Sequence, residues 1–197
     1  MGDIKSAREI AMEKINKIGE PTETERLEWK YLPEGEKLAA RYLKQETQLQ
    51  PELAKFDKKA APYVIRGASS ILIKNTVLPK DDAAQKTNQL AMDGIKAIKT
   101  DKSKVQAILD QMKQIFDHYK GMGEQQRQQA YSALKADFQT KVEQALRQQL
   151  GGNTSGVHID IEKQPQFQEE WRKIKVQLDS QYIQVLDELK RQLEDTK

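Results

Sequence analysis

The chain has 197 residues, of which 37% are hydrophobic and 32% are charged, and its formal net charge at neutral pH is +3. It contains no cysteine, which excludes disulfides, thiol catalysis, iron–sulfur clusters and zinc sites that need sulfur ligands. So small a net charge does not predict nucleic acid as a partner. No stretch approaches the roughly eighteen apolar residues of a membrane span, so we expect a cytoplasmic protein that does not enter a membrane.

The first 120 residues are expected to form a region of several helices. Residues 4–18 carry a narrow apolar stripe, which is typical of a helix that docks onto another surface. The stripe consists of Ile4, Ala7, Ala11, Ile15 and Ile18. Thr22 and Glu25 have the spacing of a capping box for a short helix, which Pro33 should end.

Three further segments of this region have helical signals. Residues 63–78 fit either a helix or a strand, with helix favoured, because β-branched residues interrupt the helical pattern. The Asp81 and Asp82 pair is expected to cap the next helix, which continues to Ile98. The spacing of Ser103 and Gln106 predicts a capping box at the start of the next helix, which runs to Tyr119.

The last third carries the strongest pattern, two long helices over residues 124–150 and from Pro165 to the C-terminus. Their apolar residues recur every three or four positions and repeat after eleven, which predicts nearly straight packing of coiled-coil type. We therefore expect a long antiparallel hairpin over residues 121–197. The stripes are Tyr131, Leu134, Phe138, Val142 and Ala145 in the first helix and Phe167, Trp171, Ile174, Leu178, Tyr182, Val185, Leu189 and Leu193 in the second.

Glutamine supports a division of the chain into residues 1–120 and 121–197. Of its 23 copies, only five precede residue 100. In outline, a long helical hairpin with a small β element over residues 124–195 resembles prefoldin-like chaperones. That resemblance implies a role in protein assembly.

Between the two long helices, residues 157–162 alternate strictly between apolar and polar side chains. This alternation predicts a short strand over 157–161, with Val157, Ile159 and Ile161 on one face. A single strand has unpaired backbone groups. Its partner would be another segment of this chain, a second subunit or an outside protein.

The opposite face of this strand would carry His158, Asp160 and Glu162, residue types that bind divalent cations. The alternative interpretation is the solvent-facing side of a half-buried strand. We favour the latter, because side chains on one strand face stand about 6 to 7 Å apart and converge poorly on one ion. No catalytic motif, phosphate-binding loop or cofactor fingerprint occurs, so no cofactor is expected.

These patterns leave the biochemical activity undefined and favour a non-catalytic helical scaffold that binds a protein partner or associates with itself. The expected contact residues are Val157, Ile159, Ile161, Trp171 and Tyr182. One alternative is a metal protein or enzyme that uses the His158, Asp160 and Glu162 cluster. The other is weak nucleic-acid binding through N-terminal lysines, Lys55, Lys58 and Lys59, but nearby acids weaken their field.

Overall fold

The computed structural model describes residues 21–149 and 160–196, and every regular element within these ranges is helical. The prediction of an all-α protein is therefore confirmed. The helix expected over residues 4–18 lies outside the described residues. The elements are α2 (Glu23–Leu43), α3 (Leu49–Leu53), α4 (Ala61–Lys74), α5 (Asp82–Ile98), α6 (Lys102–Lys120), α7 (Met122–Gln149), the 3-10 helix η1 (Ile161–Lys163) and α8 (Pro165–Asp195).

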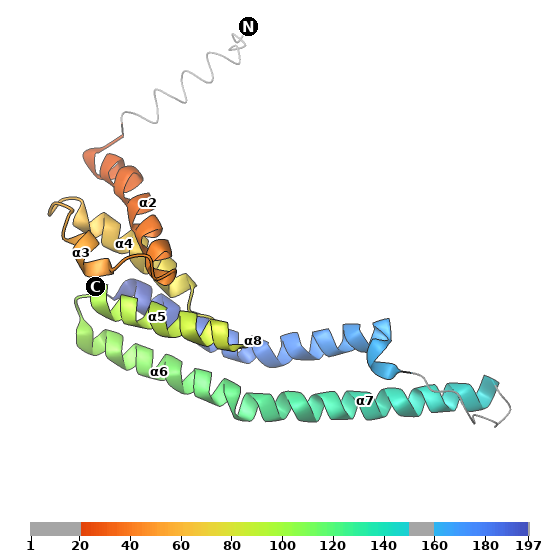
Figure 1. The fold of residues 1–197 in the computed structure, drawn as a ribbon. Coiled ribbons are helices and arrows are strands. Elements are labelled where there is room, and N and C mark those ends of the chain that lie inside the picture. The colour runs from red at the N-terminus through yellow and green to blue at the C-terminus, as the bar shows by residue number, and fades with distance from the viewer. Residues whose placement is uncertain (1–20, 150–159, 197) are drawn as a thin grey trace, which may run out of the picture.

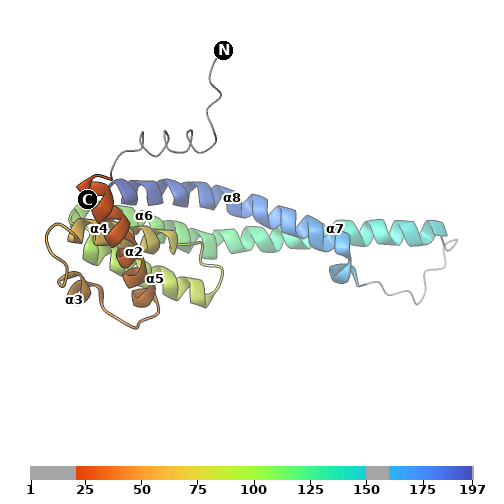
Figure 2. The same ribbon diagram turned by 90° about the horizontal axis from the view of Figure 1, so that it is seen from above.

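A long helical rod organises the molecule. Only Gly121 separates α6 from α7, so the two helices follow one another almost end to end (Figure 1). The last helix, α8, lies alongside them in the opposite direction (Figure 2). Phe167 at its start contacts Phe138 of α7, whereas Asp179 near its middle accepts a hydrogen bond from Tyr119 of α6, and the contacts with α6 continue beyond it. Thus α8 lies against α7 in its first half and against α6 in its second.

The hydrophobic core lies at the end of the rod where α2 to α5 pack on α6 and α8 (Figure 1). Leu72 of α4, Ile95 of α5 and Met112 of α6 are fully buried there. The C-terminal half of α8 belongs to the same cluster, to which it contributes Leu186 and Leu193. Residues of α2, such as Leu38, therefore share one core with residues of α8 that lie far away in the sequence.

The helix α2 continues through Pro33, so the prediction that Pro33 ends a short helix was wrong. Its capping box of Thr22 and Glu25 is present as predicted. A proline inside a helix removes one hydrogen bond and costs about 3 kcal/mol, but here packing against α4 compensates. A Cβ atom on Gly35 would lie 2.0 Å from a backbone oxygen of α4, and one on Gly67 would lie 2.1 Å from a backbone oxygen of α2. These two glycines let the helix backbones touch.

Helix N-caps account for where α5 and α6 begin. Of the pair predicted to cap α5, Asp81 is the cap, since its carboxylate accepts a hydrogen bond from the Ala84 backbone N–H at 2.7 Å, and Asp82 is the first residue of the helix. The cap of α6 was predicted wrongly. Asp101, not Ser103, caps this helix, and its carboxylate accepts from the backbone N–H of Lys104 at 3.1 Å. The ambiguous segment 63–78 is helical through Lys74.

The strand predicted over 157–161 is not seen. Ile161 instead opens η1, a single 3-10 turn that leads into α8, and its side chain is buried. Residues 157–159 lie outside the described residues. The turn η1 packs on both α7 and α8. The Ile161 side chain is therefore buried by helices and not on the face of a sheet.

Candidate functional site

Two concave surfaces flank α8, on different sides of the helix. One is a polar cleft of about 580 Å³ between α8, the start of α7 and the turn before α5. The other is a groove of about 510 Å³ between α8, α6 and the start of α7. We refer to them as the polar cleft and the glutamine groove.

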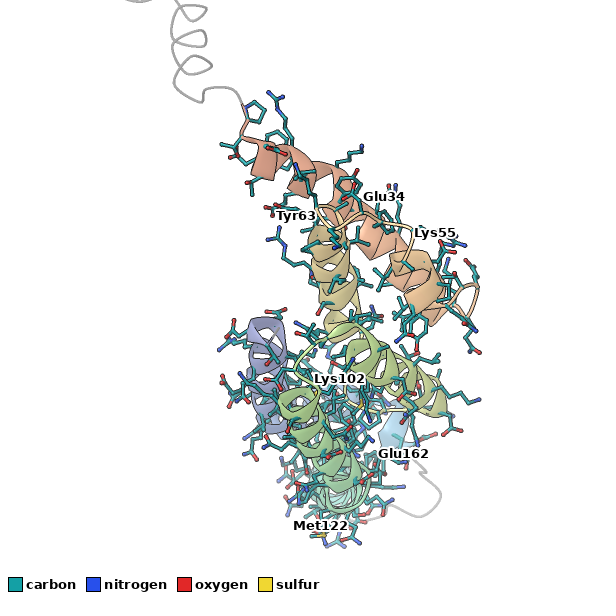
Figure 3. The ribbon with its side chains drawn as sticks, turned by 90° about the vertical axis from the view of Figure 1, so that its left-hand side faces the viewer. Glu34, Lys55, Tyr63, Lys102, Met122 and Glu162 are labelled. Carbon is teal, nitrogen blue, oxygen red and sulfur yellow. The ribbon has the colours of Figure 1, made fainter. Side chains whose placement is uncertain are left out.

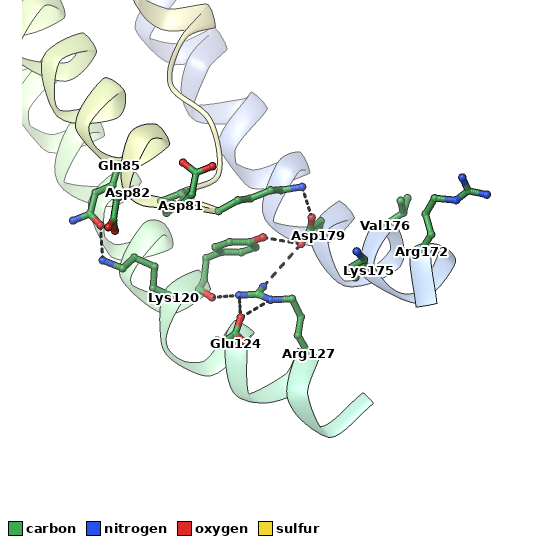
Figure 4. Close-up of a pocket in the computed structure, with 13 residues that line it drawn as sticks. Asp81, Asp82, Gln85, Lys120, Glu124, Arg127, Arg172, Lys175, Val176 and Asp179 are labelled. Carbon is green, nitrogen blue, oxygen red and sulfur yellow. Dashed lines mark hydrogen bonds and ion pairs between the residues drawn. The ribbon is translucent and has the colours of Figure 1, made fainter. Parts of the chain in front are cut away.

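The polar cleft is built around Asp179, a carboxylate that is only 7% exposed (Figure 4). The hydroxyl of Tyr119 donates a hydrogen bond to it at 3.1 Å, and Nζ of Lys80 forms an ion pair with it at 2.7 Å. A guanidinium nitrogen of Arg127 lies 4.0 Å away. The charge of this buried acid is therefore compensated by groups from three different segments.

Arg127 joins α6 to α7 at the point where Gly121 interrupts the rod. Its guanidinium lies over the ring of Tyr119, donates to the Tyr119 carbonyl at 3.0 Å and pairs with Glu124 at 2.8 Å. Gly123 leaves room for the adjacent Tyr182 hydroxyl, which a Cβ atom would approach to 3.0 Å. These contacts fix the angle between α6 and α7.

Burial raises the pKa of Tyr119 to about 12, and the neighbouring charge of Asp179 adds to the effect. With so high a pKa, the phenol stays protonated near neutral pH and does not act as an acid there. Other cations stand at the rim, where Lys120 donates to Gln85 at 2.8 Å and Arg172 faces solvent. Because the central groups already satisfy one another, the polar cleft is best understood as a clamp that holds α6, α7 and α8 together.

The glutamine groove has an apolar floor and an uncharged polar rim. Its lining residues are Gln111, Gln114, Ile115, His118, Gln126, Gln181, Tyr182, Val185 and Leu189. Val185 is 51% exposed, so its apolar side chain is open to the groove. His118 and Tyr182 bridge the groove through a hydrogen bond of 2.9 Å between Nδ1 and the hydroxyl.

The groove exists because the buried face of α8 changes along the helix. In its first half the apolar residues that face α7 include Phe167 and Trp171, as the eleven-residue pattern predicts. In its second half the core side chain is Leu186, which is 2% exposed, and its neighbour Val185 faces outward. The sequence pattern had placed Val185 in the helix contact, and the structure shows it in the groove.

The predicted contact residues fall into different environments. Trp171 is half-buried and packs edge-on against Tyr131, with ring centroids 5.0 Å apart. Tyr182 is half-buried and lines the glutamine groove. Ile161 is buried in η1, and Val157 and Ile159 lie outside the described residues. Of the predicted set, Tyr182 therefore lines the glutamine groove.

The predicted metal ligands have lysine partners where the structure describes them. Asp160 pairs with Lys163 at 2.9 Å and Glu162 pairs with Lys135 at 2.5 Å. The hydrogen bond from Lys135 lowers the pKa of Glu162. His158 lies outside the described residues. Within residues 21–149 and 160–196, no group of three or more His, Asp or Glu side chains is arranged to hold a metal ion.

The lysines considered for nucleic-acid binding lie around α3, and two of them pair with acids. Lys55 pairs with Glu52 at 2.6 Å and Lys59 pairs with Glu23 at 3.2 Å, while Lys58 is exposed. Paired lysines have less charge to offer a phosphate backbone. Sequence reasoning missed the polar cleft altogether.

The comparisons with known proteins identify a family. The model of the Family of unknown function (DUF6657) matches residues 50–195, which include both surfaces beside α8. No curated protein matches the chain. No solved structure matches it either, so the resemblance to prefoldin-like chaperones rests on residue spacing alone. In the described part of the chain, no helix has the length and apolar character needed to cross a bilayer.

Proposed function

The chain belongs to the Family of unknown function (DUF6657), and we propose that it is a non-catalytic interaction protein whose glutamine groove binds an amphipathic helix of another protein chain. One observation carries this proposal. Val185 is 51% exposed beside the half-buried rings and chains of Tyr182 and Ile115, so an apolar surface lies open in a concave site. A helix laid into such a groove buries this surface by the same ridge-and-groove packing that joins helices in a core.

The chemistry of the groove supports binding rather than catalysis. His118 is its one titratable side chain besides Tyr182, and the two bond to each other. A nucleophile with an adjacent base, or a carboxylate pair, is missing from its lining residues. Glutamine side chains on the rim donate and accept hydrogen bonds without the desolvation cost of full charges, which suits a contact surface.

The two-helix part of the rod supports the same proposal. Beyond Arg127, which contacts Tyr119 of α6, the neighbours of α7 in the described residues are α8 and η1. Two helices bury one seam incompletely, so apolar residues remain half-buried, such as Leu134 of α7 and Ile174 and Leu178 of α8. A third helix that extends from the groove along this pair of helices would cover them and complete a bundle.

The experiment is site-specific photo-crosslinking with the full chain in cells. A benzophenone amino acid replaces Val185 in one variant and Ile183 in a matched control. Ile183 is also exposed, at 43%, but lies on another side of α8. We expect discrete protein adducts from position 185 and not from position 183. Equal labelling at both positions, or no adduct at 185, would contradict the proposal.

A further inference from the structure

We propose that the helix that occupies the glutamine groove is α8 of a second copy of this chain, so that two copies pair their α8 helices in opposite directions about Val185. This inference rests on the proposed function, because it names the occupant of the same groove. Three features of the molecule identify the occupant: the groove is uncharged, the exposed stripe of α8 beside it is nearly symmetric, and this side of α8 is open.

The lining of the glutamine groove contains no Lys, Arg, Asp or Glu, although 32% of the chain is charged. Four of the lining residues are glutamines, Gln111, Gln114, Gln126 and Gln181. Among the described residues, none of these four side-chain amides makes a hydrogen bond. An amide both donates and accepts, so a surface of amides can pair with an identical surface, whereas a surface of one charge would meet its own charge.

An exposed stripe of α8 runs along the groove for about four helical turns, or roughly 22 Å at 1.5 Å per residue. Its residues are spaced by four, four, three and four positions, which places them on one face of the helix. All of them are exposed: Gln177, Gln181, Val185, Glu188 and Gln192. The stripe is nearly symmetric about Val185, because Gln177 lies eight residues before it and Gln192 seven residues after it.

Two such stripes packed in opposite directions give compatible pairs at every position. Gln177 lies opposite the partner's Gln192, and Gln181 lies opposite the partner's Glu188. The two Val185 side chains meet at the twofold axis. The two arms of the stripe differ by one residue, or about 1.5 Å of helix rise, which long glutamine side chains accommodate. Parallel pairing would instead place Glu188 against its own copy, so like charges favour the antiparallel direction.

The charge of Glu188 is compensated on its own helix. Arg191 pairs with its carboxylate at 3.7 Å, and the amide of Gln192 donates to it at 3.5 Å. The carboxylate therefore enters the contact together with a cation. A carboxylate accepts more than these two contacts, so the Gln181 amide of the other copy can donate to it as well.

The apolar part of the contact comes from Val185 and the floor of the groove. Val185 is 51% exposed, and the partner's Val185 would cover it between Ile115 and Tyr182. Because α6 forms the other wall of the groove, each α8 would contact both α6 and α8 of the other copy. This contact has few apolar residues, so we expect a dissociation constant in the micromolar range.

The position of α8 leaves this side open to a second copy. The lining residues of the groove come from α6, α7 and α8, and the described neighbours of α8 are α4, α6, α7 and η1. Viewed along the rod, α8 and α5 lie on opposite sides of α6, and the helices marked by Glu34 and Tyr63 lie away from Met122 (Figure 3). A copy that approaches the groove therefore does not meet α2, α3 or α5.

The absence of cysteine allows a direct test of this register by disulfide trapping with the full chain. Gln177→Cys is mixed with a mass-tagged Gln192→Cys, left to exchange and oxidised with diamide. A disulfide needs its Cα atoms within about 7 Å. Antiparallel pairing brings these two positions together and holds two copies of either one about 22 Å apart along the helix. We expect at least tenfold more mixed dimer than dimer of either variant with itself.

Sedimentation of cysteine-free variants provides a second readout. Val185→Asp places two charges at the twofold axis, and the matched control Ile183→Asp places the same charges on another side of α8, at a position that is also exposed. The first should raise the dimer dissociation constant by at least about tenfold, while the second should change it less than about twofold. Equal effects of the two variants would contradict the pairing.

The outcomes separate this inference from the proposed function. Trapping of Gln177→Cys with itself as efficiently as with Gln192→Cys would overturn the inference, and so would a wild-type chain that stays monomeric at all concentrations. If position 185 captures a different protein in the photo-crosslinking experiment and the chain is monomeric, the proposed function stands and the second copy is excluded as the occupant. If position 185 captures nothing, both proposals fail.

Discussion

The buried phenol of Tyr119 leads to a prediction about stability in alkali. Its side chain is 3% exposed, and its hydroxyl donates to Asp179 at 3.1 Å. Replacing it by phenylalanine keeps the ring under Arg127 and removes this hydrogen bond. A hydrogen bond to a charged group contributes about 1.5 to 3 kcal/mol, so Tyr119→Phe should lower the free energy of unfolding by that amount near neutral pH.

The size of this loss should depend on pH. The pKa of Tyr119 is raised from an ordinary 10.0 to about 12 in the folded chain. Between these values the folded chain keeps the proton and the unfolded chain loses it, so this group's contribution to stability falls as pH rises. The two units correspond to roughly 2.7 kcal/mol in total, of which about 1.4 kcal/mol is lost by pH 11.

The assay is urea unfolding of the wild type and Tyr119→Phe, followed by circular dichroism at pH near 8 and near 11. We expect the difference in unfolding free energy to shrink by about 1.4 kcal/mol between the two conditions. Absorbance titration of the phenols would show the group that titrates near pH 12 only in the wild type. A difference that is the same at both pH values would refute the reasoning.

Three other predictions concern the packing that positions the two surfaces. Gly67→Ala should lower the free energy of unfolding by about 3 kcal/mol or more in urea titrations, because its Cβ would meet the α2 backbone at 2.1 Å. The control variant Gly121→Ala, at an exposed site, should lower it by less than about 1 kcal/mol. Lys99→Met should remove the bond of 2.5 Å to the Thr196 carbonyl and speed hydrogen exchange in the last turn of α8; unchanged exchange there would argue against this clamp. Asp101→Ala should lower the melting temperature, because loss of this N-cap reduces the free energy of unfolding by about 1 kcal/mol, while Ser103→Ala should leave it unchanged. A larger effect of Ser103→Ala would show that Ser103 caps α6 after all.

The long helices and several caps could be predicted from sequence because their causes are local. Apolar spacing of three and four, with no Pro or Gly in between, defined α7 and α8 to within a few residues. Thr22 and Asp81 each cap a helix through contacts within four residues. Such signals are complete within one segment of the chain.

Other features could not be predicted because their causes lie elsewhere in the chain. The passage of α2 through Pro33 depends on contact with α4 at Gly35 and Gly67, residues that are far apart in sequence. The outward position of Val185 follows from a change of partner along α8, from α7 to α6. A spacing pattern that assumes one partner assigns Val185 to the buried face.

The polar cleft had a sequence signal that spacing alone did not exploit. Asp179 lies seven residues before Leu186, so both occupy one face of α8. An acid on a core-facing position requires buried cationic or hydroxyl partners. The partners, Arg127 and Tyr119, belong to other helices and could be assigned only from the fold.

The central claim, that the glutamine groove binds a helix of another chain, is tested most directly by light-activated crosslinking from Val185. The account predicts specific adducts with a protein chain, which disappear when the photoreactive group is moved two residues to Ile183. Capture that does not depend on which of these two exposed positions carries the group would contradict it, because the exposed apolar surface of α8 would then have no preferred binding face.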